Sequence, residues 1–531
     1  MRDRAALYAL LLICLAQAMS MVDRQIVAIL LPRIKADLGV GDAEMGVLYG
    51  TAFALFYAVF SLPLGKLADT WMRTRILSAS IALWSGMTAL GGMTMSFGVL
   101  ALSRLGVGIG EASVQPAGLS LISDHFAPER RGTASAAFAV SITLGLGASL
   151  WIGGTTADWW DAAYAAGLAP LGLRGWQAAF IAAALPGLVL SVFLWRLPEP
   201  ERGRMDGISS SNHPTPFRTS ARTLGEVLPL LNLAMLRRRR APALGYVANL
   251  LFVAICVAGV IAMASWTDAM RGGGFTPVRI LGAEISGNWL QWAITGLGAC
   301  VLFNWAQNLR ATDRPSFALI AKTPSLLMLF AMASLQTVVN YGVMAWTPSF
   351  LIQRFDLSAA DVGLKFGAVV VVAGTVGPAI AGPLSDFFKT RFAGGRILVA
   401  LLALTVSPLL AFFVYHSQSP AEFYLLFGIY CATLSMWLPP VYASFIDLVL
   451  PRMRGAVVSV YVVSTTIFGL GLGPYGVGLV SDLNGGDLAA AILSVYWFGP
   501  IIVALLFTLV WQLPRDEGSV IDRARLAGEP V

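Results

Sequence analysis

Long apolar runs separated by short polar segments recur along the whole chain. A helix needs about 20 residues to cross about 30 Å of hydrocarbon, and the chain offers two sets of six such runs with two more between the sets. The first set is 5–32, 44–65, 74–96, 99–123, 133–157 and 176–197. The second set is 323–351, 362–384, 395–416, 421–449, 456–480 and 490–512. The pattern predicts an all-α membrane protein.

The two runs between the sets, 243–266 and 287–309, differ in polarity. The first has no charged residue, whereas the second contains Asn288, Gln291, Asn304 and Gln307. Both segments could cross the membrane, or they could lie on its surface or pack laterally. We favour crossing, because two added spans keep the loops alternating between the two sides. The predicted total is therefore twelve plus two transmembrane helices.

The composition supports a membrane protein and excludes other classes. Hydrophobic residues make up 57% of the 531 residues and charged residues only 12%, about half the share in an ordinary soluble domain. The many aromatic rings exclude a disordered chain. The net charge of +7 is typical of basic cytoplasmic loops in a membrane protein, so we predict no nucleic-acid partner.

The positions of the basic residues predict the orientation of the chain. If the N-terminus lies in the cytoplasm, 27 of the 36 Lys and Arg residues fall in cytoplasmic loops and 7 in outer loops. Cytoplasmic loops of membrane proteins carry such an excess of positive charge. We therefore expect a multi-pass protein of a bacterial inner (cell) membrane with both termini cytoplasmic. The first run lacks a small-residue cleavage site, which favours a mature helix over a signal peptide.

The runs divide the chain into five predicted parts. These are an N-terminal six-helix bundle (1–197), a cytoplasmic linker (198–242), the inserted pair (243–310), a C-terminal six-helix bundle (311–513) and a cytoplasmic tail (514–531). The Pro and Ser content of the linker predicts a flexible connection. Its arginine tetrad, Arg237–Arg240, is either a stop signal beside the next span or a contact for anionic lipid headgroups.

The two six-helix sets are internally related. An offset of 317 relates Gly46 to Gly363, Gly65 to Gly382, Leu67 to Leu384 and Asp69 to Asp386. An offset of 323 relates Pro116 to Pro439, Asp124 to Asp447, Pro128 to Pro451 and Gly132 to Gly455. Matches in a common register indicate a duplicated unit. Transporters built from such repeats bind their substrates near mid-membrane, where the repeats meet.

The repeated motifs resemble those of the major facilitator superfamily. The run GKLAD at 65–69, followed by Arg73 and Arg75, is similar to the family's loop signature after the second helix. The run GPLSD at 382–386, with Lys389 and Arg391, is its copy. The resemblance implies two pseudo-symmetric six-helix bundles and transport by alternating access.

A narrower resemblance is to spinster-type transporters. It rests on MVDR at 21–24 and on RLGVGIGEAS at 104–113. Members of that group are associated with export of lysolipids and sphingoid phosphates, some with proton coupling. The inserted pair is not part of the spinster pattern, and the fifth run (Gly145–Gly154) lacks the Gly-Pro of the usual antiporter-associated motif, so the direction of transport stays open.

Charged residues inside the apolar runs are the first candidate site residues, because each costs several kcal/mol unless it is paired or hydrated. Run 5–32 carries Asp23 and Arg24. Run 99–123 carries Arg104 and Glu111, about 10 Å apart along one helix face, and Gln115 continues that face. We assign these five residues to substrate binding and proton coupling.

Each of these assignments has a structural alternative. We expect Asp23 and Arg104 to approach, either as a static ion pair or as a proton-sensing carboxylate beside a binder of an anionic head group. Glu111 either exchanges a proton or hydrogen-bonds to a neighbouring backbone. Gln336, Asn340 and Trp346 either line the cavity or bond between helices.

A second group of candidates lies at the predicted cytoplasmic helix ends. Asp69 and Asp386 sit there beside basic residues, where charge pairs can hold the inner face closed, although a solvated loop turn is the alternative. The predicted gate consists of Gly65, Asp69, Arg73, Arg75, Asp386, Lys389 and Arg391.

Together these features predict a secondary active transporter that works by alternating access and is coupled to protons. Its expected substrate is an amphiphilic anion such as a lysolipid or a sphingoid-phosphate-like lipid. The alternatives are a carrier of small organic anions or drugs, and an uncoupled facilitator. We expect a monomer without cofactor, whose partners are protons, a small-molecule or lipid substrate and the lipid bilayer.

Two other classes are disfavoured. His125, His213 and His416 are scattered, so we predict no catalytic group, no metal site and no enzyme. The chain has no phosphate-cradling P-loop motif, which argues against direct use of ATP. A sensor built on the same fold would fit a long soluble effector domain, and none is predicted.

Overall fold

The computed structural model describes residues 2–39, 52–208, 213–270, 277–280, 283–357 and 359–530. Over these residues the chain is almost entirely helical, apart from an antiparallel hairpin of β1 (Pro277–Ile280) and β2 (Ala283–Ser286). Gly46 and the start of the predicted run 44–65 lie outside the described residues, as does the segment 271–276.

The first six predicted runs are helices that form one bundle. They are α1 (Arg2–Leu38), α3 (Ala52–Thr70), α4 (Arg73–Gly92), α5 (Phe97–Glu111) followed by α6 (Val114–His125), α7 (Arg131–Ala165) and α8 (Gly175–Arg196). The short turns η2 (Pro128–Arg130) and η3 (Pro170–Gly172) precede α7 and α8. We call this the first bundle.

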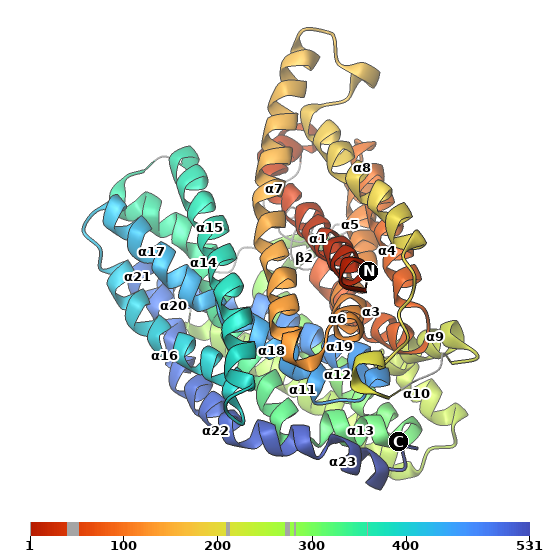
Figure 1. Cartoon of the computed structure of the whole chain (residues 1–531). Coiled ribbons are helices and arrows are strands. Elements are labelled where there is room, and N and C mark those ends of the chain that lie inside the picture. Colours follow the sequence, from red (N-terminus) through yellow and green to blue (C-terminus); the bar gives the residue numbers. More distant parts are fainter. Residues whose placement is uncertain are drawn as a thin grey trace.

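The last six runs form the second bundle. They are α14 (Pro324–Phe355), α15 (Ala359–Lys389), α16 (Gly395–Tyr415), α17 (Pro420–Ser435) with α18 (Leu438–Asp447), α19 (Arg454–Ser464) with η6 (Thr465–Leu470) and α20 (Gly471–Leu483), and α21 (Leu488–Ser494) with η7 (Val495–Phe498) and α22 (Gly499–Gly518). The turn η5 (Pro451–Met453) precedes α19. Figure 1 shows that the two bundles meet around α6, α18 and α19 and diverge toward the top of the view.

Eleven helical segments within the described residues are long and apolar enough to cross a membrane. The three other predicted runs coincide with α3, α4 and α12 (Gly287–Thr312), which are also helical. The predicted class, an all-α multi-pass membrane protein, is therefore confirmed.

The fourth helix of each bundle is broken at the same place in the repeat. α5 gives way to α6 at Ala112–Ser113, and α17 gives way to α18 at Met436–Trp437. Pro116 and Pro439 lie in the first turn of the second piece, where a missing backbone N–H is tolerated but a continuous helix would lose a hydrogen bond. Gln115, which is expected to continue one helix face from Arg104, lies just beyond this interruption, at which Ala112 and Ser113 keep helical backbone angles.

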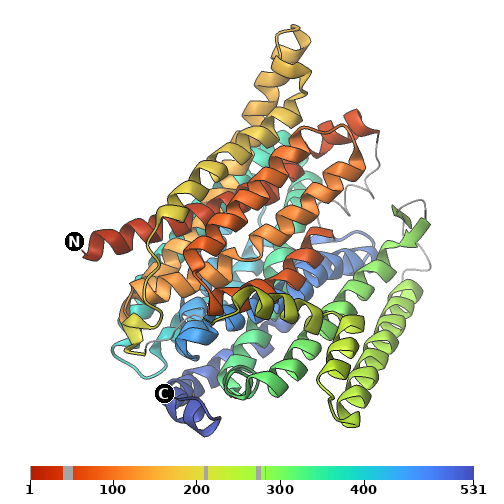
Figure 2. The same ribbon diagram turned by 90° about the vertical axis from the view of Figure 1, so that its right-hand side faces the viewer.

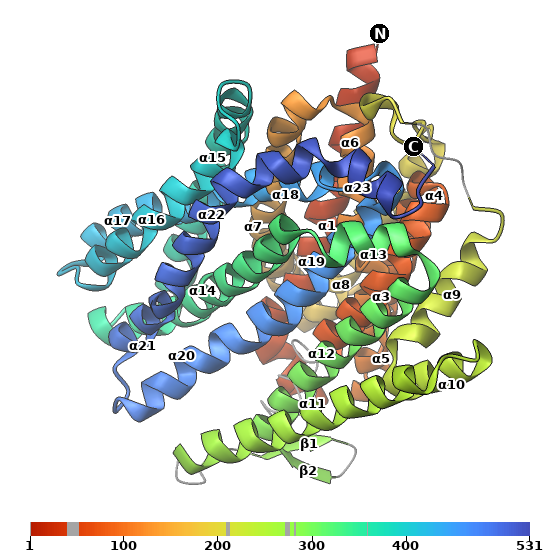
Figure 3. The same cartoon turned by 90° about the horizontal axis from the view of Figure 1, so that it is seen from below.

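The inserted pair consists of α11 (Ala243–Met270) and α12, and it stands beside both bundles (Figure 2). Seen from below, α12 lies between α3 and α20, with α11 at the outer edge (Figure 3). α12 packs against α3 of the first bundle and against α19 and η6 of the second. The insertion thus covers one side of the junction between the bundles.

The polar residues of α12 point into the protein and not toward lipid. Asn288 Nδ2 donates to the carbonyl of Ala264 at 2.9 Å, and Gln307 Nε2 donates to the carbonyl of Gly245 at 2.7 Å. Asn304 Nδ2 reaches the carbonyl of Val227 at 3.1 Å. Because these amides bond within the protein, they do not oppose a membrane-crossing α12.

The linker is more ordered than its composition predicts. It forms η4 (Arg204–Asp206), α9 (Pro216–Val227) and α10 (Pro229–Arg238), and two short helices follow elsewhere, α13 (Arg314–Ala321) and α23 (Val520–Leu526). The rings of Phe217 and Trp71 lie 4.6 Å apart, and Ser220 Oγ donates to the carbonyl of Pro63 at 2.7 Å. The prediction of a flexible linker is therefore wrong for α9, whose packing against α3 outweighs its polar composition.

The topology can be tested with reporter fusions. We expect reporters fused after Arg240 and after Arg314 to lie in the cytoplasm, and a reporter inserted at Gly273 to lie on the opposite side. The reason is that the basic residues concentrate on the side of the linker. A cytoplasmic signal from Gly273 would show that α11 and α12 do not both cross, and would leave the other twelve helices unaffected.

Candidate functional site

The centre of the first bundle holds a buried ion pair. Arg24 on α1 donates to Glu111 Oε2 on α5 through Nη2 at 2.9 Å and through Nε at 3.3 Å. Ser20 Oγ donates to the same oxygen at 2.9 Å. The Arg24 guanidinium also lies 4.7 Å from the ring centre of Phe53 and 4.6 Å from that of Tyr57. Arginine binds aromatic faces in this way through the ring quadrupole.

The two partners differ in accessibility. The Glu111 side chain is 0% exposed, whereas the Arg24 side chain is 15% exposed. Glu111 Oε1 has no hydrogen-bond partner among the described residues. A ligand could therefore reach the arginine without first reaching the carboxylate. The alternative that Glu111 bonds to a neighbouring backbone is not what the structure shows.

Asp23 and Arg104 do approach, as expected, and the Asp23 carboxylate lies within electrostatic reach of the Arg104 guanidinium. Arg104 Nη2 donates to the main-chain carbonyl of Asp23 at 3.0 Å. The Asp23 carboxylate is fully buried beside Thr88 and Trp84 of α4. Successive residues of a helix point about 100° apart, so Asp23 and Arg24 face different neighbours. This is why Glu111 is paired with Arg24.

Tyrosines of both bundles surround this centre. Tyr341 on α14 lies within electrostatic reach of Arg24 and Tyr57. Tyr442 on α18 and Tyr461 on α19 also belong to the second bundle, and the centres of their rings are 5.5 Å apart. Sequence reasoning missed these residues. The sequence did contain a signal for them, because a tyrosine hydroxyl inside an apolar run needs a polar partner when it is buried.

The other central candidates have separate roles. Gln336 Nε2 donates to Asn340 Oδ1 at 2.9 Å, so the two amides share one face of α14 as expected. Trp346 Nε1 donates to the carbonyl of Pro474 at 2.8 Å, which joins α14 to α20. Trp346 therefore bonds between two helices, which is the second of the alternatives for this residue. Gln115 lies on α6 with its amide oxygen buried and without a partner among the described residues.

At the predicted cytoplasmic end, each bundle caps a helix of the other. Asp69 accepts hydrogen bonds from the backbone N–H of Gly455 at 2.7 Å and of Ala456 at 2.8 Å, at the start of α19. Asp386 accepts from the N–H of Gly132 at 2.9 Å and of Thr133 at 2.7 Å, at the start of α7. A carboxylate at a helix N-terminus satisfies free N–H groups and the positive end of the helix dipole.

The glycines of the repeat permit this close approach. A Cβ atom on Gly65 would lie 1.9 Å from Ser459 Oγ and 2.6 Å from the carbonyl oxygen of Gly455. A Cβ atom on Gly382 would lie 2.4 Å from the Cβ of Ala136. Any larger residue at these positions must push α3 away from α19, or α15 away from α7.

A set of ion pairs surrounds the two caps. Arg131 Nη1 donates to Asp447 Oδ1 at 2.5 Å, and Arg454 Nη1 donates to Asp124 Oδ1 at 3.0 Å, so each pair joins the two bundles. Asp206 of the linker accepts from both arginines, at 2.9 Å and 2.5 Å. We call Asp124, Arg131, Asp206, Asp447 and Arg454 the ion-pair layer.

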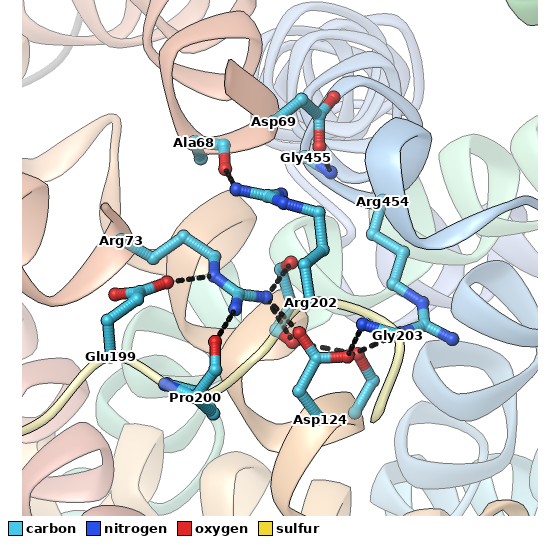
Figure 4. Close-up of polar contacts among 12 residues, drawn as sticks. Ala68, Asp69, Arg73, Asp124, Glu199, Pro200, Arg202, Gly203, Arg454 and Gly455 are labelled. Atoms are coloured by element: carbon cyan, nitrogen blue, oxygen red, sulfur yellow. Dashed lines mark hydrogen bonds and ion pairs between the residues drawn. The ribbon is translucent and has the colours of Figure 1, made fainter. Parts of the chain in front are cut away.

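Two further arginines hold the aspartates of the layer in place. Arg73 pairs with Asp124 inside the first bundle (Figure 4), and Arg396 Nη1 donates to Asp447 Oδ2 at 2.5 Å inside the second. Lys389 Nζ also donates to Asp447, at 2.6 Å. Of the predicted gate residues, Gly65, Asp69, Arg73, Asp386 and Lys389 therefore lie at this junction.

Two predicted gate residues, Arg75 and Arg391, do not lie at this junction. The Arg75 guanidinium lies 4.2 Å from the ring centre of Trp195, and that of Arg391 lies 3.8 Å from the ring centre of Phe387, each within one bundle. The residue that matches Arg73 in the repeat is Arg396, at an offset of 323. The offset changes from 317 to 323 within this loop. For this reason Lys389 and Arg391, and not Arg396, were predicted as the copies of the first basic pair. Arg131 and Arg454 follow the same offset of 323 and were detectable by it.

The first residues of the linker complete the network, and sequence reasoning missed their role. Arg73 Nε donates to Glu199 Oε1 at 2.7 Å, and the N–H of Gly203 donates to Asp124 Oδ1 at 3.0 Å. Arg202 Nη2 donates to the carbonyl of Ala68 at 2.9 Å, close to Asp69 (Figure 4). Burial, together with the nearby charge of Arg73, lowers the pKa of Arg202 to about 10.

Two related six-helix bundles that meet through reciprocal contacts, with a buried ion pair at the centre of the first, have the architecture of a membrane transporter. The family description that matches is that of the Major Facilitator Superfamily, over residues 13–345. The chain belongs to this superfamily, as its motifs predicted. The family is one of transporters and not of enzymes.

Relatives extend this assignment. An MFS-type efflux pump of Mycolicibacterium smegmatis is 24% identical over 494 residues, which cover 92% of this chain and 88% of the pump. The sphingosine-1-phosphate transporter SPNS2 of Danio rerio is 32% identical over 160 residues, about 30% of this chain and 32% of that protein. The spinster-type similarity thus covers about a third of each chain.

A solved structure shows the same fold. A bacterial homolog to the human lysosomal transporter spinster, in an inward-facing and unoccupied conformation, superimposes with a TM-score of 0.53 at 21% identity. The match covers 98% of this chain and 96% of that structure.

The junction at Gly65 and Asp69 can be tested by distance measurement. Gly65→Ala should destabilise the contact between α3 and α19 by about 1–3 kcal/mol, as overpacking does, and Asp69→Ala should do so by removing a helix cap. We expect spin labels at Arg130 and Thr390, exposed residues of the two bundles, to move apart in both variants.

Gly86→Ala is the matched control, because nothing lies within 4 Å of a Cβ atom built at Gly86. Label distances that are the same in Gly65→Ala and in Gly86→Ala would contradict the assignment of this junction as a gate.

Proposed function

We propose that the chain is a proton-coupled secondary transporter of an amphiphilic anion, working by alternating access. The observation that carries this proposal is the Arg24–Glu111 pair, which is buried at the centre of the fold and lies beside tyrosines of the other bundle. A buried charge pair that is not needed for packing is expensive. In membrane proteins such charges mark substrate and proton pathways.

The pair offers a physical basis for coupling. An anionic head group that takes Arg24 as its partner displaces Glu111, since both compete for one guanidinium. A carboxylate left in apolar surroundings without its arginine takes up a proton. Anion and proton are then linked through Arg24 without their sites touching. Arg104 has a positioning role in this scheme, because it holds the backbone of α1 at Asp23.

Alternating access needs two states with different contacts. The ion-pair layer and the helix caps at Asp69 and Asp386 hold the bundles together at one end, while the bundles diverge toward the other (Figure 1). Opening the end that holds the ion-pair layer breaks the contacts between the bundles. It leaves the pairs Arg73–Asp124 and Arg396–Asp447 intact, because each lies within one bundle. The predicted orientation places this end in the cytoplasm of a bacterial cell, so the structure corresponds to an outward-facing state.

The substrate proposal rests on the two kinds of surface at the centre. Arginine supplies a planar fork for a phosphate or carboxylate. Phe53 and Tyr57 supply apolar faces beside it. A lysolipid or a sphingoid phosphate combines both features, and a sphingosine-1-phosphate transporter is among the relatives of this chain.

The second candidate is export of small organic anions or drugs. It is favoured by the relative named an efflux pump, which aligns with 92% of this chain, whereas the sphingosine-1-phosphate transporter aligns with about 30%. A panel of lysolipids, sphingoid phosphates and organic anions, scored by thermal stabilisation of the purified protein, separates the two. We expect the amphiphilic phosphates to stabilise the wild type, but not Arg24→Ala.

Coupling is tested by flux in proteoliposomes with and without a pH gradient. We expect Arg24→Ala to lose nearly all flux, because it removes the guanidinium that the anionic substrate takes as its partner. Arg24→Lys should restore little, because a point charge lacks the bidentate fork. Glu111→Gln should keep substrate binding but lose the dependence on the gradient.

Arg391→Ala is the matched control, because this arginine lies on the ring of Phe387, away from the centre. If wild-type flux ignored the gradient at every pH, the chain would be an uncoupled facilitator. If Asp23→Asn removed the pH dependence and Glu111→Gln did not, Asp23 would be the proton carrier.

A further inference from the structure

A large cavity lies beside Asp69, outside the central site. Its volume is about 1010 Å³, and it opens between the end of α3, the linker helices α9 and α10, the end of α12, and η5. Small-molecule sites measure about 300–1,000 Å³. The cavity therefore has room for an organic compound and not only for a bare ion.

The lining of the cavity is strongly basic. Its cationic residues are Lys66, Arg218, Arg222, Arg238, Arg239 and Arg452, and its carboxylates are Asp69, Glu226 and Asp313. The cations thus exceed the carboxylates by three charges. Cations gathered in a concave surface raise the local concentration of anions.

The three carboxylates are already engaged. Asp69 accepts from backbone N–H groups of α19, as described above. Asp313 Oδ2 accepts from Arg452 Nη1 at 2.8 Å, and Glu226 forms ion pairs with Arg222, at 3.0 Å between Oε1 and Nε, and with Arg239. They are therefore not placed to neutralise the remaining arginines.

Two arginines of the lining stand apart from these pairs. Arg218 on α9 and Arg238 on α10 are exposed, and neither has a hydrogen bond or an ion pair with any residue in the described part of the chain. Arg238 belongs to the tetrad Arg237–Arg240, of which only Arg238 and Arg239 line the cavity. A simple stop signal beside a membrane span would not require two of its four arginines to share a cavity with α9.

The cavity takes its cations from both bundles. Lys66 belongs to the first bundle and Arg452 to the second, and Asp313, between α12 and α13, lies 3.5 Å from Lys66 Nζ and 2.8 Å from Arg452 Nη1. Burial disfavours the charged form of Asp313, but its hydrogen bonds with Arg452 and the charge of Lys66 hold its pKa below the usual range. The bundles are thus already bridged here by one anionic group.

We propose that this cavity binds a multiply charged phosphate group, carried by an organic phosphate or by a lipid headgroup, and that binding stabilises the closed form of the ion-pair layer. Arginine forks match phosphate oxygens in pairs and form strong charge-assisted hydrogen bonds. A phosphate that contacts Lys66 and Arg452 together binds only while the two bundles are joined at this end. By linkage, such a ligand favours that state over the open one.

The soluble probe is inorganic pyrophosphate, added to the full-length protein in detergent and followed by titration calorimetry, with potassium sulfate at equal ionic strength as the reference. We expect saturable binding to the wild type. We expect the dissociation constant to rise at least about tenfold in Arg218→Ala/Arg238→Ala, because each change removes a charge-assisted contact.

The matched control is Arg237→Ala/Arg240→Ala, which removes the same charge from outside the cavity. It should bind pyrophosphate like the wild type. Equal binding by the cavity variant, or an equal loss in the control, would overturn the site.

The lipid probe is a nanodisc of phosphatidylcholine with or without cardiolipin. Thermal stabilisation by cardiolipin that disappears in Arg218→Ala/Arg238→Ala identifies a lipid headgroup as a ligand, and binding of pyrophosphate identifies a soluble phosphate. If neither probe bound the wild type, the proposal would be refuted.

The conformational part is read from the spin labels at Arg130 and Thr390. Either bound probe should enlarge the population with the short distance, and the cavity variant should not respond. Binding without any change in the distance distribution would refute the link to the closed state. The label distance does not depend on the transported substrate. A failure of this proposal can therefore be distinguished from a failure of the proposed function.

Discussion

The reciprocal capping of two helices by two aspartates is the interaction on which the rest of the structure depends. Asp69 reaches the start of α19 and Asp386 reaches the start of α7, so each bundle supplies the acid that the other lacks. Both contacts require a backbone approach that only glycine allows, at Gly65 and at Gly382. Once the helices are this close, Arg131 and Arg454 are carried across the junction to acids of the opposite bundle.

The pseudo-symmetry ends at the centre, and this difference has functional meaning. The charges of the central cluster lie on α1 and α5 of the first bundle, whereas the second bundle presents Tyr341, Tyr442 and Tyr461. A guanidinium binds an anion strongly and a phenol ring binds apolar matter. Under the function proposed above, the arginine would receive the head of the substrate, and the aromatic side chains of both bundles would receive its body.

Much of this structure was predictable, because hydrophobic length and the internal repeat are direct physical signals. The helical runs, the glycines and the aspartates Asp69 and Asp386 follow from them. The pairing of Arg24 with Glu111 did not, because it depends on how α1 is rotated against α5. Arg391 was assigned in place of Arg396 because the repeat changes its offset within a loop. The packing of α9 was missed because its contacts with α3 are invisible in its composition.

The capping contacts also constrain how the chain can be assembled. Asp69 and Gly455 are 386 residues apart, and a ribosome that adds about 5–20 residues per second needs on the order of 20–80 s to pass from one to the other. From the end of α8 at Arg196 the first bundle is complete in its helices, but the start of α7 lacks its partner until Asp386 is made, and Asp69 lacks its partner until Gly455 is made. In a nascent first bundle, these groups must therefore be hydrated at the membrane surface. The junction can therefore form only after most of the chain has been made.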